Sequence, residues 1–158
     1  MSTESLQSVL EGEHRAIDSA IEPLVAGGSV SAERREAMVQ AADTLRRHIY
    51  AEEELLFPQL RAARMVGPVL VMLREHAQMW QTLDALDRLL ESTSIGDDAI
   101  PVLARQLFTQ LQAHNPKEEA ILYSQIEVAL GSVELAQLRQ FLESGQLPQD
   151  WMCQQLQV

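Results

Sequence analysis

Residues 48–60 read His48-Ile-Tyr-Ala-Glu52-Glu53-Glu54-Leu-Leu56-Phe57-Pro58-Gln59-Leu60, and residues 114–126 repeat the pattern as His114-Asn-Pro-Lys-Glu118-Glu119-Ala-Ile-Leu122-Tyr123-Ser-Gln125-Ile126. A weaker repeat joins Glu13-His14 to Glu75-His76. The repeating unit is a helical hairpin with one histidine on its first helix and His-x3-Glu on its second. Two such hairpins packed about an approximate twofold axis would bring two matched ligand sets into one core, and each set could hold one metal ion.

The periodicity of the whole chain predicts helices. Apolar residues recur at three- and four-residue steps, and no stretch alternates with a period of two. We expect long helices over about 5–26, 31–64, 68–91 and 98–131, and a shorter one over about 132–143. Pro58 should bend the second helix near its end, and the polar stretch 92–98 should reverse the chain.

Short connections force neighbouring helices to run antiparallel. The expected fold class is therefore all-α, an antiparallel up-down-up-down four-helix bundle with a short C-terminal helix and tail. We expect one domain over 1–158, with the bundle at about 5–130 and the C-terminal helix and tail at 132–158. The tail contains Pro148, Trp151 and Met152, which we expect to pack on the bundle, and no chemistry is expected there.

Composition excludes several classes of function. The chain of 158 residues has a formal net charge of −11, which disfavours binding to nucleic acid and to anionic membrane surfaces. Neither a signal-peptide pattern nor a membrane-spanning apolar run is present in the sequence, so we expect a soluble, cytoplasmic protein. The single cysteine, Cys153, cannot form an internal disulfide. Any metal must be held by nitrogen and oxygen.

Helical spacing selects ligands within the two motifs. Residues four apart project from one face of an α-helix, as His48 and Glu52 do, and His114 and Glu118 likewise. The neighbouring acidic residues Glu53, Glu54 and Glu119 fall further round an ideal helix, so we expect them to be solvated.

The two selected glutamates interrupt apolar stripes, where an ionised carboxylate without a partner is costly. A metal cation removes that cost. The histidines give the same indication, because all four fall on inward stripes, one on each long helix: His14, His48, His76 and His114. Imidazole and carboxylate together suit iron, manganese or zinc.

These motifs resemble the hemerythrin family, specifically its bacterial HHE-type cation-binding domains, over about residues 6–130. The resemblance implies a four-helix bundle and a non-haem di-iron centre, with manganese or zinc as less favoured metals. It also implies that Glu52 and Glu118 bridge the two irons together with a solvent-derived oxo or hydroxo group. The ligands it implies are His14, His48, Glu52, His76, His114 and Glu118.

One feature departs from the oxygen-carrying members of that family, which have a fifth histidine one turn from another ligand on the third helix. In this chain Met72 and Trp80 occupy the positions four residues before and after His76. One iron would then have an open position or a substitute carboxylate, for which Asp18, one turn after the first histidine, is the nearest candidate. Simple reversible oxygen carriage is not expected. Met72, Met79 and Trp80 could line a pocket beside the metals.

Three functions are compatible with such a centre. The leading hypothesis is a non-haem di-iron protein that binds, senses or reacts with a small diatomic molecule or peroxide (O2, NO or H2O2). The second is a di-iron enzyme that decomposes peroxide or oxidises a small organic substrate. The third is a metal-responsive regulatory module in which metal occupancy switches a partner surface, with the C-terminal helix and tail, residues 132–158, as the responding element. A protein partner or a homo-oligomer is compatible with the sequence. A purely structural zinc site is the remaining alternative.

Overall fold

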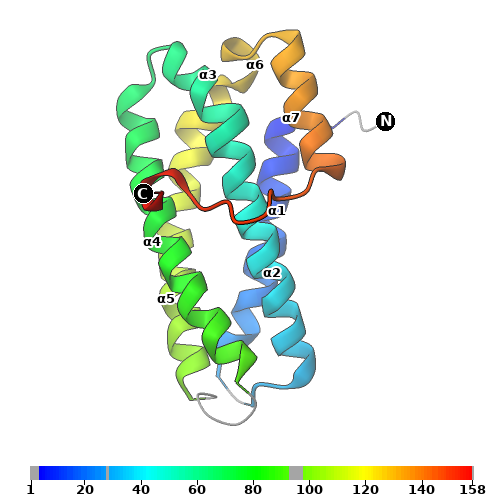
Figure 1. Cartoon of the computed structure of the whole chain (residues 1–158), viewed down its shortest axis with the longest axis vertical. Coiled ribbons are helices and arrows are strands. Elements are labelled where there is room, and N and C mark those ends of the chain that lie inside the picture. The colour runs from blue at the N-terminus through cyan, green and yellow to red at the C-terminus, as the bar shows by residue number, and fades with distance from the viewer. Residues whose placement is uncertain (1–3, 28, 93–97, 158) are drawn as a thin grey trace.

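The computed structural model describes residues 4–27, 29–92 and 98–157, and within them the prediction of an all-α bundle is confirmed (Figure 1). Most of the connection expected over 92–98 lies outside the described residues. The elements are α1 (Leu6–Val25), α2 (Ala32–Tyr50), the π-helix η1 (Ala51–Leu56), α3 (Phe57–Ala62), α4 (Val66–Glu91), α5 (Ala99–Lys117), the π-helix η2 (Glu118–Leu122), the 3-10 turn η3 (Tyr123–Gln125), α6 (Ile126–Ala129), α7 (Ser132–Ser144) and the 3-10 turn η4 (Gln154–Leu156).

Local sequence fixes where the first two helices begin. The hydroxyl of Ser5 accepts a hydrogen bond from the backbone N–H of Ser8, and that of Ser31 accepts one from Arg34. These are N-caps, which satisfy backbone donors that have no partner within the helix. After α1, Gly27 takes a φ of +88°, a left-handed conformation that costs glycine little and ends the helix.

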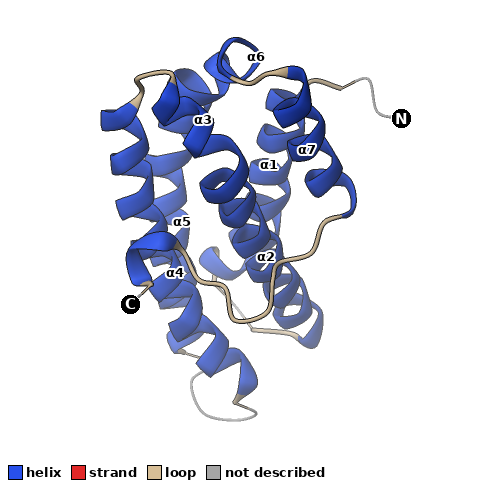
Figure 2. Ribbon diagram, turned by 45° about the horizontal axis from the view of Figure 1, so that its top comes forward, coloured by secondary structure: helices blue, strands red, loops and turns tan. Residues whose placement is uncertain are grey.

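Four helices form the bundle. α1 packs on α2 and α5, and α4 packs on α5 and α2, so each helix contacts two antiparallel neighbours (Figures 1 and 2). The chain after α7 crosses the outside of this bundle to reach η4 (Figure 2). In the described part of the chain, no helix is both long and apolar enough to cross a lipid bilayer.

A π-helical segment interrupts each helix that carries a His-x3-Glu motif. At the end of η1 the N–H of Phe57 donates to the carbonyl of Glu52, and at the end of η2 the N–H of Tyr123 donates to the carbonyl of Glu118. These bonds span five residues instead of four. Pro58 is the second residue after η1, but the corresponding residue after η2 is Ser124, so a proline at this position is not the common cause.

The apolar core consists of two clusters with the histidines between them. One cluster includes Ile17, Leu45, Met79 and Leu111, and the other includes Leu10, Ala51, Met72 and Leu122. Along every long helix, the histidine therefore separates a residue of one cluster from a residue of the other. The polar site therefore lies across the middle of the bundle, between two apolar clusters.

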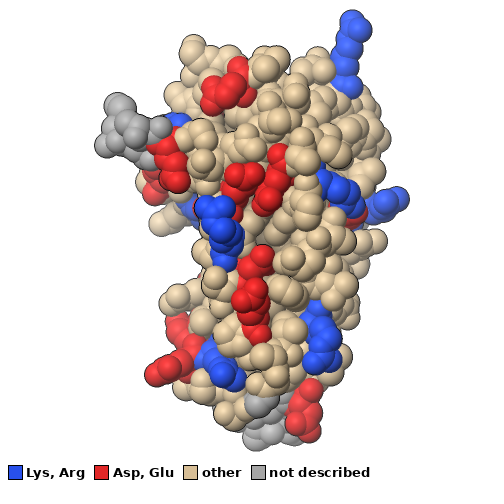
Figure 3. All heavy atoms as spheres, turned by 180° about the vertical axis from the view of Figure 1, so that it is seen from behind, with Lys and Arg blue, Asp and Glu red and all other residues tan. Residues whose placement is uncertain are grey.

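Charged side chains are interspersed on the face that Figure 3 draws, where Asp and Glu alternate with Lys and Arg. Between α2 and α4, Arg46 lies 2.8 Å from carboxylate oxygens of both Asp84 and Asp87. Ion pairs with solvent-exposed carboxylates contribute little to stability. The concentration of buried charge inside the bundle is therefore the more informative feature.

Candidate metal centre

The four histidines form two buried pairs. In one pair His14 Nε2 lies 3.1 Å from His48 Nε2, and the ring centroids are 4.7 Å apart. In the other, the rings of His76 and His114 are 4.9 Å apart, and both pairs have an interplanar angle of 50°. Each pair belongs to one hairpin of the sequence repeat, so the predicted twofold relation is present in the geometry.

Glu118 joins the two pairs. Its carboxylate is fully buried, with Oε1 at 3.2 Å from His14 Nε2 and Oε2 at 3.0 Å from His114 Nε2 and 3.4 Å from His76 Nε2. One carboxylate therefore presents an oxygen to each histidine pair, which is the arrangement expected of a bridging ligand.

Glu52 is the counterpart of Glu118 in the first repeat and is also fully buried. Its Oε1 lies 3.3 Å from His76 Nε2 and 3.5 Å from His48 Nε2, so it too faces both pairs. This oxygen has no hydrogen-bond partner among the described residues. A buried carboxylate oxygen in that position is costly in a metal-free protein and suits a cation.

The donor set fits two metal positions. Two groups of side chains each bring ligand atoms within 4.8 Å of one another, and both groups include Glu118: His14 and His48 in one, His76 and His114 in the other. Because these donors are imidazole nitrogens and carboxylate oxygens, the set suits first-row transition metals. Six such ligands exceed the four of a closed tetrahedral zinc site.

A second ring of carboxylates orients the imidazoles. While every Nε2 points into the centre, every Nδ1 is hydrogen-bonded to a glutamate, which fixes the ring and its tautomer. The pairs are Glu13 with His48 at 2.8 Å, Glu75 with His114 at 2.9 Å, Glu53 with His76 at 2.7 Å and Glu119 with His14 at 2.8 Å.

Two of these contacts correct the expectation that Glu53 and Glu119 are solvated. Glu53 is 1% exposed and the Glu119 side chain is 35% exposed. The expectation assumed an ideal α-helix, in which a residue five positions after a histidine points away from it. The π-helical turns align residues five apart instead, so Glu53 and Glu119 reach the site as well as the two glutamates that precede them. Glu54 is exposed, as expected.

The carboxylates shift the titration of the histidines. Burial alone would lower the pKa of His48, but the charge of Glu52 and the hydrogen bond to Glu13 raise it to about 10. The pKa values of His76 and His114 are raised for the same reason, against their burial. Burial would raise the pKa of Glu118, but the neighbouring histidines hold it well below its ordinary value. Protons therefore occupy the metal-free site.

Tyr123 is a site residue that the spacing argument missed. Its hydroxyl donates to Glu52 Oε2 at 2.6 Å and lies 3.1 Å from His48 Nε2 and 3.2 Å from His14 Nε2. Burial and the nearby carboxylates raise its pKa well above the ordinary value. The internal repeat gives no signal for it, because the corresponding residue of the first repeat, Phe57, has no donor atom.

The remaining candidates lie outside the two ligand groups. Asp18 is half-buried, and its Oδ2 accepts a hydrogen bond from Gln112 on α5. Met72 belongs to one apolar cluster, whereas Met79 and Trp80 belong to the other. Trp80 packs edge-on against Trp151 of the C-terminal tail.

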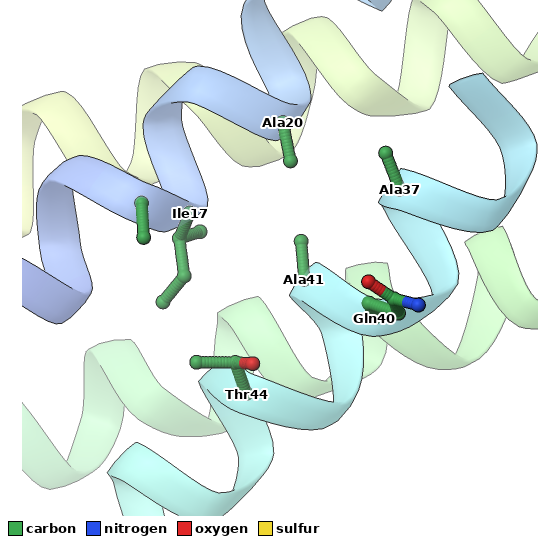
Figure 4. Close-up of a pocket in the computed structure, with 7 residues that line it drawn as sticks. Ile17, Ala20, Ala37, Gln40, Ala41 and Thr44 are labelled. Atoms are coloured by element: carbon green, nitrogen blue, oxygen red, sulfur yellow. The ribbon is translucent and has the colours of Figure 1, made fainter. Parts of the chain in front are cut away.

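A groove of about 210 Å³ between α1 and α2 starts one turn away from the first histidine pair (Figure 4). Ile17, three residues after the first histidine, and Thr44, four residues before the second, line it. The rest of its lining includes Ala20, Ala37 and Ala41. Small side chains therefore form the groove, and none of the six candidate ligands is among the residues that line it.

The C-terminal tail packs on the bundle, as expected, and reaches the second ring of carboxylates. The backbone N–H of Gln154 donates to Glu53 Oε1 at 2.7 Å, and its side-chain amide donates to the Glu53 carbonyl at 3.1 Å. Trp151 is packed against Tyr50 and donates to Glu54 through its indole N–H. The tail therefore holds the carboxylate that orients a histidine.

Comparisons with known proteins identify one family. A family model described as the hemerythrin HHE cation binding domain matches residues 5–126, which is more than half of the chain. The match covers both histidine pairs, Glu52 and Glu118. No curated protein and no solved structure matches the chain.

The three consecutive glutamates after His48 offer a matched test of the second ring. Glu53→Gln removes the charge that orients His76 and should weaken metal binding by roughly 10- to 100-fold. Glu54→Gln, at an exposed position one residue away, should leave the affinity unchanged. Calorimetric titration of both variants with iron(II) or zinc(II) measures the difference. Equal affinities would show that Glu53 does not support the site.

The metal-free protein should lose stability as the pH rises. A histidine whose pKa is raised by folding stabilises the folded state fully at pH values below its pKa in the unfolded chain, about 6.5. That stabilisation is lost as the pH rises through the pKa in the folded state, which is about 10 for His48. Each such histidine lowers the free energy of unfolding by about 1.4 kcal/mol per pH unit in this window.

Urea denaturation of chelator-treated protein between pH 6 and pH 10 measures this effect. The lowered pKa of Glu118 acts in the opposite sense, since its contribution is lost only as the pH falls below about 4.5. Metal-loaded protein should show a smaller decline, because its histidines are already deprotonated. A metal-free stability that is flat or rises over this range would contradict the assignment of protons to the site.

Proposed function

Because this chain belongs to the hemerythrin HHE cation-binding domain family, we propose that it is a non-haem di-iron protein that binds, senses or reacts with a small diatomic molecule or peroxide. The observation that carries this proposal is the pair of buried histidine pairs joined by Glu52 and Glu118. His14 and His48 would hold one iron, His76 and His114 the other, and both glutamates would be shared.

The charge of the site supports two metal ions over one. Six carboxylates surround the four imidazoles, four of them in the second ring. Arg47 lies 3.5 Å from Glu13, and Lys117 forms an ion pair with Glu75. Four negative charges then remain, and two divalent cations would offset them when the histidines are neutral. A single divalent ion would leave two negative charges without compensation, at least one of them buried.

Iron is favoured over zinc because the ligand set leaves room for an external ligand. Iron would supply one-electron redox chemistry and open coordination positions toward O2, NO or H2O2. The protein's own contribution is to orient every imidazole through its Nδ1 and to exclude bulk water with an apolar cluster on each side. Small molecules are the ligands that such a buried site admits most readily.

Metal content and gas response test the proposal together. The purified chain, reconstituted with iron(II), should bind two irons, and its visible absorption should change on exposure to O2, NO or H2O2. Glu52→Gln removes a shared ligand and should lower the iron content by at least one ion per chain. Glu54→Gln is the matched control and should retain both irons and the response.

Two results would contradict the proposal. The first is one metal ion, or none, bound per chain under conditions where the control variant is folded. The second is a chain that holds two irons and responds to none of the three molecules. Zinc bound with an affinity far above that of iron, and without any response, would instead favour a structural role.

A metal-responsive regulatory module is a second candidate, and the C-terminal contacts favour it. His76 Nδ1 donates to Glu53 Oε2, and Glu53 Oε1 accepts a hydrogen bond from the backbone N–H of Gln154. The Glu53 carboxylate therefore links the candidate ligand His76 to the tail. Arg47, which pairs with Glu13, also donates to backbone carbonyls at the end of α7, including that of Leu142 at 2.8 Å. Gln154 therefore contacts the second ring directly, and the end of α7 is linked to it through Arg47.

Hydrogen exchange distinguishes this candidate. A metal bound at His76 Nε2 fixes the imidazole with its Nδ1–H toward Glu53, which should hold Gln154 more firmly. Amide exchange over residues 150–157 should then slow at least about fivefold on metal loading. The first turns of α2, far from the site, serve as the internal control. Identical exchange of the tail in both forms would exclude the tail as the responding element.

A further inference from the structure

The two halves of the centre differ at one pair of corresponding residues. Both repeats place Leu and then an aromatic residue after the His-x3-Glu motif, as Leu56-Phe57 and Leu122-Tyr123. Phe57 stacks on His76 with ring centroids 5.5 Å apart, and Tyr123 stacks on His14 at 5.6 Å. The packing of the two rings is therefore equivalent, and a single hydroxyl group distinguishes them.

That hydroxyl lies among the ligand atoms of one half. The Tyr123 oxygen is 2.6 Å from Glu52 Oε2, 3.1 Å from His48 Nε2, 3.2 Å from His14 Nε2 and 3.3 Å from Glu118 Oε1. A phenol has one proton to donate, so it satisfies only one of these neighbours as a donor. An oxygen that converges with four ligand atoms in a fully buried site is placed as a ligand would be.

We infer that Tyr123 is a further protein ligand, which binds through its phenol oxygen the metal ion held by His14 and His48. This inference rests on the proposed di-iron function. As the metal–oxygen bond forms, the O–H bond breaks and the proton leaves to solvent, because a bound cation favours the anionic form of its ligand. Phe57 offers no donor atom to the other metal, so the ion at His76 and His114 has one protein ligand fewer and receives the external molecule.

The colour of the oxidised protein tests this ligand directly. A phenolate bound to iron(III) gives a charge-transfer band in the visible region, and excitation in that band enhances the ring vibrations of the phenolate in the Raman spectrum. Wild-type protein, loaded with iron and oxidised, should show both features. Tyr123→Phe should lose both while retaining two irons, because the ring that packs on His14 is preserved.

The pseudo-twofold relation supplies a second variant. In Phe57→Tyr combined with Tyr123→Phe, the hydroxyl is moved to the corresponding position beside His76. The phenolate band should return in this double variant. A band that persists in Tyr123→Phe alone would overturn the inference, and so would wild-type protein that holds two irons without any phenolate vibrations.

Azide, a small anionic probe, tests which metal is open. Azide added to the oxidised wild-type protein should bind without removing the phenolate vibrations, because it enters on the side of His76. Loss of those vibrations on azide binding, or failure of azide to bind, would overturn the assignment of the open position.

Iron content distinguishes failure of the proposed di-iron function from failure of the Tyr123 assignment. A chain without iron refutes the proposed function, whereas two irons without phenolate signals refute only the role of Tyr123.

Discussion

The burial of Glu52 and Glu118, both fully inaccessible to solvent, determines the arrangement of the polar groups around them. An ionised carboxylate in an apolar core costs several kcal/mol unless charged or hydrogen-bonding partners surround it. Four imidazoles supply those partners, and the second ring of glutamates in turn holds the imidazoles. The two central glutamates thus require the imidazoles, and the imidazoles require the second ring of glutamates. This arrangement is stable only when it holds positive charge, as protons or as metal ions.

The hydrogen bonds of the second ring join the two hairpins reciprocally. Glu13 orients His48 within the first hairpin. Glu53 of the first hairpin orients His76 of the second hairpin. In return, Glu119 of the second hairpin orients His14 of the first. Neither hairpin alone holds a complete ligand set. The site therefore forms only when the hairpins associate, so ligand geometry is determined by tertiary packing and not by either repeat.

Much of this centre could be predicted from the sequence, because helical periodicity and the internal repeat both depend on spacing. They identified the helices, the inward faces and the His-x3-Glu pairs. The burial of Glu53 could not be predicted, since it requires a π-helical turn that periodicity does not report. Tyr123 was missed because its role depends on contacts between helices. The link from Gln154 to Glu53 joins residues about 100 positions apart and is visible only in the folded chain.

The position of the site across the middle of the bundle explains how the chain tolerates so much buried charge. Apolar clusters lie on both sides of the histidines, and each one packs residues from several helices. Hydrophobic burial therefore continues above and below the polar layer, so the bundle has an apolar core besides the site. Under the proposed function, metal ions would replace protons in this site. Their binding free energy would then depend on the oxidation state and on external ligands, as that proposal requires.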